Sequence, residues 1–211
     1  MKVLLFGAGG RVGKVVLAEL AARGHDVTAA FRAKPFPDGL PANVKPVVGD
    51  ATDAASVAAA AKGQDAVVSA VGPGVLKNAE VIETAAHALV EGLEKAGTKR
   101  LLIVGGAGTL EIRPGVMRLD DPSYPEQYRP QGVRQKVALE TFRASSLDWT
   151  YISPAILFNP GERTGKYRVG GDAVLADASG KSAISFEDFA IALADEIETP
   201  RNLRRRVTYA Y

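Results

Sequence analysis

The sequence predicts an α/β protein built on a doubly wound parallel sheet with helices on both faces. Short, continuously apolar segments alternate with amphipathic helical patterns from residue 2 to residue 153. Strands that are apolar throughout are typical of parallel sheets, which helices cover on both sides. A glycine-rich turn, "FGAGGRVGK" (residues 6–14), joins the first strand pattern to the first helical pattern. Right-handed crossovers between such units produce the doubly wound arrangement.

The first half of the chain is predicted to hold five strands and three connecting helices. "KVLLF" is a strand, because its apolar run is only four residues long and glycines follow at once, unlike a signal peptide. The first helix has an apolar face at the spacing of a helix and ends at Gly24, and the second and third helices also end at glycines. A loop at 33–45 contains three of the twelve prolines. The strands are 2–6, 26–31, 45–50, 65–71 and 100–106, and the helices are 11–23, 52–63 and 78–96.

The second half is predicted to be less regular. Residues 106–130 are a long, proline-rich loop, and loops of this length in a compact domain are usually functional or mobile. A helix at 131–144 and a strand at 148–153 follow, and a last strand covers 205–211. Residues of about 155–185 form a small substrate-side lobe on a single domain, 1–211, with the strand candidates "AVLAD" (173–177) and "SAIS" (182–185). Ser185 and Asp188 resemble a capping box at the start of a final helix.

Composition excludes several functions. The net charge is +2, which does not favour nucleic acid as a partner, and no apolar run is long enough to cross a membrane. The chain has no cysteine and only two histidines, so disulfides, thiolate chemistry and a metal site are not expected. We expect a cytoplasmic protein, monomer or homodimer, that acts on a small molecule.

The glycine-rich turn predicts a dinucleotide-binding loop. Its glycines allow a tight turn and a close approach to a pyrophosphate, while the helix that follows offers free N–H groups and a positive dipole end. Val12 breaks the second spacing of the G-x-G-x-x-G pattern, so the match is to G-x-x-G-x-x-G. The alternative is an ordinary tight turn packed on a helix.

The end of the second strand favours NADP over NAD. Arg32 stands roughly twenty residues beyond the glycines, where an acidic residue would bind the ribose of NAD and an arginine suits a 2′-phosphate. Lys34 is near, and Arg11 could assist from the other side. Arg32 could instead be a solvated cation at a strand end.

The ends of the next strands should lie on the same edge of the sheet, where open α/β folds bind ligands. Asp50 could accept a hydrogen bond from the adenine amine, or could cap the next helix. Small residues in "SAVGPG" (69–74) and "VGGAG" (104–108) would let a cofactor lie close to the backbone. The predicted cofactor-binding residues of these segments are Gly7, Gly9, Gly10, Arg11, Val12, Gly13, Arg32, Asp50, Ala51, Ala70, Val71, Gly72, Gly105 and Gly106.

The sequence resembles the atypical short-chain dehydrogenase/reductase superfamily, and within it the NADH-flavin reductase group, which is related to NmrA-like proteins. The matching segments run nearly end to end: "FGAGGRVG", "GDATD", "SAVGPG", "LLIVGGAGTLE", "LDWTYISPA", "FNPGERTGKYRVGGD" and "SAISFEDFAIALADEIETP". The resemblance implies a single Rossmann-like domain with a short C-terminal substrate lobe. Ser153, Pro154 and Ala155 follow the sixth strand near the nicotinamide end, where we expect them to shape the pocket rather than to react.

The resemblance also shows what is missing. Many relatives use a Tyr-x-x-x-Lys pair, with a serine or threonine near the fifth strand, to move the proton that accompanies hydride transfer. Lys136 matches the lysine, Gly132 stands in place of the tyrosine, and Gly105 and Gly106 stand where the serine is often found. Lys136 is therefore expected to hold the nicotinamide ribose, or else to be a solvated helix lysine.

Two functions fit this pattern. The first is an NADPH-dependent reductase that passes hydride to a flavin-like or quinone-like acceptor, with the flavin as a substrate and space for its ring near the glycines at 105, 106 and 132. The second is a non-enzymatic NADP-sensing or scaffold protein of NmrA-like type. In the lobe, Arg163, Lys166 and Arg168 could bind an anionic substrate or belong to a solvated hairpin.

Overall fold

The computed structural model describes residues 1–73 and 78–211 and confirms the predicted fold class. Twelve strands and five α-helices lie in the described chain, with three short 3-10 turns, η1 to η3. The helices are α1 (Arg11–Ala22), α2 (Ala54–Ala61), α3 (Glu80–Ala96), α4 (Arg129–Arg143) and α5 (Phe186–Glu198). The strands are β1 (Lys2–Phe6), β2 (Asp26–Phe31), β3 (Val44–Val48), β4 (Ala66–Ser69), β5 (Arg100–Val104), β6 (Glu111–Arg113), β7 (Val116–Met117), β8 (Asp148–Pro154), β9 (Leu157–Asn159), β10 (Arg168–Gly170), β11 (Ala183–Ser185) and β12 (Arg205–Ala210).

The central sheet has eight strands in the order β10-β12-β8-β5-β4-β1-β2-β3. All neighbouring pairs are parallel except β10 and β12, which are antiparallel. The chain runs outward from β1 to β3 and then returns to β4 on the other side of β1. This reversal is the switch point at which doubly wound folds bind ligands, beyond the carboxyl ends of the strands.

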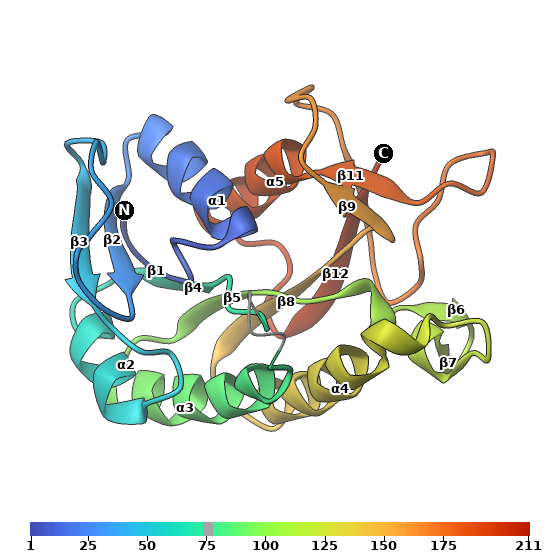
Figure 1. The fold of residues 1–211 in the computed structure, drawn as a ribbon, viewed down its shortest axis with the longest axis horizontal. Helices are drawn as coiled ribbons and strands as arrows, with labels where there is room; N and C mark the ends of the chain where they lie inside the picture. Colours follow the sequence, from blue (N-terminus) through green and yellow to red (C-terminus); the bar gives the residue numbers. More distant parts are fainter. Residues whose placement is uncertain (74–77) are drawn as a thin grey trace.

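Helices cover both faces of the sheet, as Figure 1 shows. On one face α1 and α5 pack over Val68, Leu102 and Ile152. On the other face α2, α3 and α4 pack over Leu4, Leu101 and Trp149. Successive residues of a strand therefore point into two different cores, which explains why the central strands are apolar throughout. None of the helices in the described residues is long and apolar enough to cross a membrane.

The helix ends follow the local chemistry of the sequence. Asp53 caps α2 by accepting hydrogen bonds from the backbone N–H groups of Ala55 and Ser56. Gly97 ends α3 in the left-handed conformation, with φ 73°. Ser185 caps α5 by accepting a hydrogen bond from the Asp188 N–H, as predicted. The Asp188 carboxylate, however, turns toward the lobe and accepts from Thr164 instead of completing the box.

Two predictions about irregular regions were wrong. The segment 106–130 is not an unstructured loop, because β6 and β7 form a small antiparallel hairpin within it, flanked by the turns η1 (Ala107–Thr109), η2 (Arg118–Asp120) and η3 (Glu126–Tyr128). "AVLAD" is not a strand, and only Ala173 makes an isolated bridge, to Glu111.

Within 155–185, β9 and β11 pair with each other and lie apart from the central sheet, whereas β10 joins the sheet's edge (Figure 1). The division into one domain, 1–211, with a substrate-side lobe at about 155–185 stays a prediction.

Candidate functional site

The glycine-rich turn is closed so tightly that two of its positions exclude any side chain. Gly7 has φ 79°, and a Cβ atom there would lie 2.6 Å from the carbonyl oxygen of Ala70. A Cβ atom at Gly13 would lie 2.0 Å from the carbonyl oxygen of Gly7. The Gly10 N–H closes the turn with a 2.9 Å hydrogen bond to that same carbonyl. The turn after β1 is therefore in direct contact with the end of β4. These two neighbouring strands lie on either side of the switch point.

The amino end of α1 is open toward this turn. Gly10 is its cap residue and offers no side-chain hydrogen bond, and the first turn of the helix holds no acidic residue. The first backbone hydrogen bond of the helix runs from the Lys14 N–H to the Gly10 carbonyl. The N–H groups of the first turn are thus available to an anion, and the helix dipole adds a positive potential there.

Cations and aromatic rings gather where β2 ends, beside the glycine turn. Arg32 and Lys34 are exposed, and the Lys34 amine lies 5.7 Å from the centre of the Phe36 ring. Phe36 is 5.7 Å from Phe31, whose ring lies 3.6 Å from the position of a Cβ at Gly9. This arrangement could hold an aromatic base carrying a nearby phosphate group.

Arg11, at the start of α1, points toward the lobe. Its guanidinium lies over the ring of Phe186, 5.3 Å from the ring centre, at the start of α5. Phe186 in turn packs edge-to-face on Phe158 of β9. Arg11 therefore lies against the lobe, and its part in cofactor binding from the other side of the site stays a prediction.

Asp50 does not cap α2, so that alternative was wrong. Its Oδ1 accepts hydrogen bonds from the backbone N–H of Thr52, at 2.9 Å, and from the Thr52 hydroxyl, at 2.7 Å. The helix cap is Asp53, three residues later. Asp50 is half-buried and the neighbouring Ala51 is buried. Contact between Asp50 and an adenine amine stays a prediction.

The ends of β4 and β5 complete the same edge of the sheet. Ala70 and Val71 are half-buried and Gly72 is exposed, and no atom of the described residues, apart from its chain neighbours, lies within 4 Å of the position of a Cβ atom at Gly72. Gly74, the last residue of "SAVGPG", lies outside the described residues.

Three glycines expected to leave space for a flat ring do not do so. A Cβ atom at Gly105 would lie 2.1 Å from the Tyr151 ring, and one at Gly106 would lie 1.9 Å from the Gln135 side-chain oxygen. At Gly132 a Cβ atom would lie 3.2 Å from the Tyr124 hydroxyl. Larger residues therefore fill the space that these glycines leave, and any acceptor must bind elsewhere along the edge.

Tyr124 is a residue that sequence reasoning missed. Its hydroxyl lies beside both Gly132 and Gly108, where a Cβ atom would be 2.7 Å away. The guanidinium groups of Arg118 and Arg129 lie 5.0 and 5.8 Å from the centre of its ring. Burial raises the pKa of Tyr124, and the two arginines oppose that change only in part, so the phenol is protonated at neutral pH.

Lys136 lies on α4 next to Gln135, the residue that contacts Gly106. Its amine is 3.7 Å from a carboxylate oxygen of Asp120 in η2, and both side chains are about half exposed. An ion pair this exposed is weak, so the lysine is free to reach another partner.

The end of β8 is buried. The Ser153 side chain is fully buried, and its hydroxyl has no hydrogen-bond partner in the described part of the chain. Pro154 and Ala155 are also buried. These buried residues can support the wall of a pocket. Direct contact between the Ser153 hydroxyl and a ligand would require movement of the residues that cover it.

The arginines of the lobe fasten it to the rest of the protein. Arg163 forms an ion pair at 3.1 Å with Glu19, a buried residue of α1. Arg168 donates hydrogen bonds to the carbonyl oxygens of Ala176 and Tyr211. Arg163, Lys166 and Arg168 are all exposed, and the choice between an anionic-substrate site and a solvated hairpin stays a prediction. In the described residues no group of His, Cys, Asp or Glu side chains is placed to hold a metal ion.

Together the switch point, the glycine turn and the open helix end define a dinucleotide-binding protein of the Rossmann-like class. The model of an NAD(P)H-binding family matches residues 7–200, and the chain belongs to this family. It is one of the atypical short-chain dehydrogenase/reductase-like proteins, as predicted.

Three solved structures illustrate the relationship. A protein from Burkholderia pseudomallei, described as a "putative exported protein", is 45% identical over the whole of both chains, with a TM-score of 0.91. A "putative epimerase" from Bacteroides thetaiotaomicron is 36% identical, covers 100% of this chain and 96% of its own, and has a TM-score of 0.90. A "putative NADH-flavin reductase" from Streptococcus pneumoniae is 31% identical, with coverage of 100% and 99% and a TM-score of 0.88.

Proposed function

We propose that the protein is an NADPH-dependent reductase that transfers hydride to a flat, conjugated acceptor such as a flavin or a quinone. The observation that carries this proposal is the glycine turn at the switch point, where two Cβ positions are excluded and the α1 N–H groups are open. A bound pyrophosphate would fit there without any rearrangement of a side chain. The nicotinamide, once bound, supplies the hydride.

In this proposal the residues of the chain bind and orient. Gly7, Gly10 and Gly13 allow backbone N–H groups to approach the pyrophosphate. The Arg32 guanidinium donates two parallel hydrogen bonds to the 2′-phosphate. The Lys136 amine leaves its weak ion pair with Asp120 and donates hydrogen bonds to the hydroxyls of the ribose next to the nicotinamide. The lobe of residues 155–185, fastened through Arg163 and Glu19, covers the acceptor. Catalysis is then a matter of proximity and orientation.

The acceptor explains why no tyrosine is needed at position 132. A reduced flavin or quinone takes its proton from water, so the protein needs no acid at that point. An epimerase or an alcohol dehydrogenase would need a side chain that moves a proton. The relative named as an epimerase therefore does not guide our choice of reaction.

The Lys136→Ala variant should bind NADPH about tenfold more weakly, because a charge-assisted hydrogen bond to the ribose is lost. Its kcat should fall much less than its affinity. Fluorescence titration with NADPH and steady-state rates would measure the two effects. A large fall in kcat with unchanged affinity would instead assign the lysine a direct role in the chemistry.

The Tyr124→Phe variant should keep its kcat within about twofold of the wild type, because the acceptor takes its proton from water. Tyr124 is the one phenol whose hydroxyl is seen against Gly132 in the described chain. Rates should be measured across neutral pH with a flavin and with a quinone. A fall of about 100-fold or more, the size expected for loss of a general acid, would identify Tyr124 as the proton donor.

The second candidate function is an NADP-sensing or scaffold protein of NmrA-like type. It is favoured because the side chains of Tyr151, Gln135 and Tyr124 occupy the space beside the glycines at 105, 106 and 132. No room is left there for the ring of an acceptor. NADPH oxidation with FMN, FAD and a set of quinones distinguishes the two. The reductase proposal requires saturable turnover well above the rate without protein, whereas tight NADPH binding without turnover on any acceptor would establish the sensor.

A cytoplasmic location and a monomeric or homodimeric state belong to the same proposal. The cytoplasm supplies NADPH, although one close structural relative is described as exported. Cell fractionation and the mass of the protein in solution test these two points.

A further inference from the structure

The side-chain amide of Gln135 is buried at the carboxyl edge of the sheet. Gln135 lies on α4, one residue before Lys136, and is only 6% exposed. Its amide lies against the backbone of Gly106, since a Cβ atom there would be 1.9 Å from the amide oxygen and 2.5 Å from the amide nitrogen.

This amide has no hydrogen-bond partner among the described residues. The hydrogen bond that Gln135 accepts from the Tyr151 hydroxyl, at 3.4 Å, goes to its backbone carbonyl and not to its side chain. A buried amide that stays unpaired costs free energy, so buried polar groups are nearly always paired. An unpaired amide at the ligand-binding edge of the fold therefore indicates contact with a ligand.

The amide lines a small and mainly apolar hollow. The hollow has a volume of about 20 Å³ and lies between α3, α4 and the carboxyl ends of β4 and β5. Its polar lining residues are Ser69, Gln135 and Tyr151. The half-buried residues of its lining, which mark where it opens, are Val71, Ile82 and Val104.

The hollow restricts the kind of group that can meet the amide. None of its described lining residues is charged, so a neutral group is favoured over an ion, which would lose its hydration without a counter-charge. A volume of about 20 Å³ admits one small polar group and no ring. Gly105 and Gly106 are half-buried, so the edge of a ring can approach the amide from outside.

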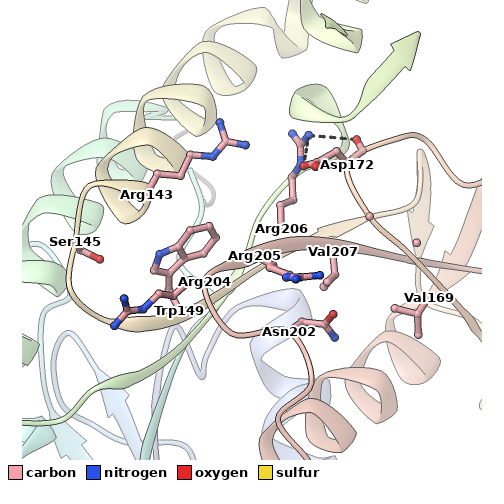
Figure 2. Close-up of a pocket in the computed structure, with 12 residues that line it drawn as sticks. Arg143, Ser145, Trp149, Val169, Asp172, Asn202, Arg204, Arg205, Arg206 and Val207 are labelled. Carbon is pink, nitrogen blue, oxygen red and sulfur yellow. Dashed lines mark hydrogen bonds and ion pairs between the residues drawn. The ribbon is translucent and has the colours of Figure 1, made fainter. Parts of the chain in front are cut away.

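The hollow at the opposite edge of the sheet does not gather its polar groups in this way. It has a volume of about 710 Å³ and lies between the end of α4 and the starts of β8 and β12. Figure 2 shows that its arginine side chains point in different directions. Arg206, the buried one, is already paired with Asp172 at 2.6 Å.

We propose that Gln135 selects the acceptor by pairing with an imide edge, which is a ring carbonyl beside a ring N–H. The amide donates one hydrogen bond to that carbonyl and accepts one from that N–H, as glutamine does with the edge of adenine. A flavin ring presents an imide edge. A quinone offers only carbonyl oxygens and would leave the amide oxygen of Gln135 unpaired. The proposal rests on the proposed reductase function and narrows its acceptor to the flavin-like class.

Flavin fluorescence tests the proposal by measuring binding without turnover. Riboflavin and 3-methylriboflavin, in which a methyl group replaces the imide hydrogen, would each be titrated with the full chain saturated with NADP⁺. The wild type should bind 3-methylriboflavin about tenfold more weakly than riboflavin, because a buried hydrogen bond is lost. The Gln135→Met variant, which keeps the length of the side chain, should bind riboflavin about tenfold more weakly and should not distinguish the two flavins.

Gln131→Met is the matched control, because it makes the same change one turn earlier on α4, at a half-buried residue that does not line the hollow. It should bind both flavins like the wild type. If Gln135→Met failed to fold, the comparison of the two flavins on the wild type would still test the proposal.

Equal binding of the two flavins by the wild type would overturn the proposal, as would a Gln135→Met variant that still distinguishes them or an absence of saturable flavin binding. NADPH oxidation with riboflavin on the same protein separates this outcome from the reductase proposal. Flavin binding that depends on Gln135 but gives no turnover would refute the reductase and support the assignment of Gln135.

Discussion

Replacing Gly13 by alanine should lower the affinity for NADPH by at least about 100-fold, the largest effect of any single substitution that we expect at the site. The added methyl group would lie 2.0 Å from the carbonyl oxygen of Gly7 and 2.8 Å from its carbonyl carbon. Both are backbone atoms, so the turn itself must move. Movement of the turn misaligns several N–H groups at once, and each hydrogen bond to a charged phosphate is lost or lengthened.

Gly9→Ala is the matched control for this substitution. A Cβ atom at Gly9 would meet only the Phe31 ring, at 3.6 Å, which is ordinary contact. Gly13→Ala should also lower the free energy of unfolding by about 2 kcal/mol, as overpacking does, whereas Gly9→Ala should not. Thermal unfolding and NADPH titration would be measured on both. A Gly13→Ala protein that is stable and binds NADPH normally would contradict the assignment of the turn.

Replacing Arg32 by glutamine should raise the KM for NADPH about 30-fold and leave the KM for NADH nearly unchanged. Only NADPH carries the 2′-phosphate, so only NADPH loses a contact. Arg32 is exposed at the end of β2, so its removal should not affect folding. Steady-state rates with both cofactors give the ratio directly.

Lys45→Gln is the control for Arg32→Gln, because it removes another exposed cation from the neighbouring strand β3. It should leave both KM values unchanged. If Arg32→Gln raised the two KM values equally, the arginine would have no part in distinguishing the cofactors, and the preference for NADPH would have to be abandoned.

The sequence was most informative where structure depends on neighbouring residues. The unit β1–α1–β2 followed from one apolar run, one helical period and the glycines between them. The doubly wound class also followed, because crossovers of one hand leave few arrangements open. The helix cap at Ser185 is local in the same way.

The predictions that failed depended on residues far apart in the chain. No local pattern reveals that Tyr151 fills the space at Gly105, or that Gln135 fills the space at Gly106. The pair of Arg163 with Glu19 joins residues 144 positions apart, so the lobe arginines could not be assigned from their neighbours. The strands β6 and β7 have only three and two residues, too few to show a period of two.

The central claim is direct hydride transfer from NADPH to a conjugated acceptor without an acid from the protein. Its most direct test is a single-turnover experiment without oxygen, in which protein with bound NADPH, or with NADPH deuterated at the transferred position, is mixed with FMN. We predict that flavin absorbance and nicotinamide absorbance fall together, more slowly with deuterium, and at the same rate in the Tyr124→Phe variant. Flavin that stays oxidised while NADPH stays bound, with the same result for quinones, would contradict the account.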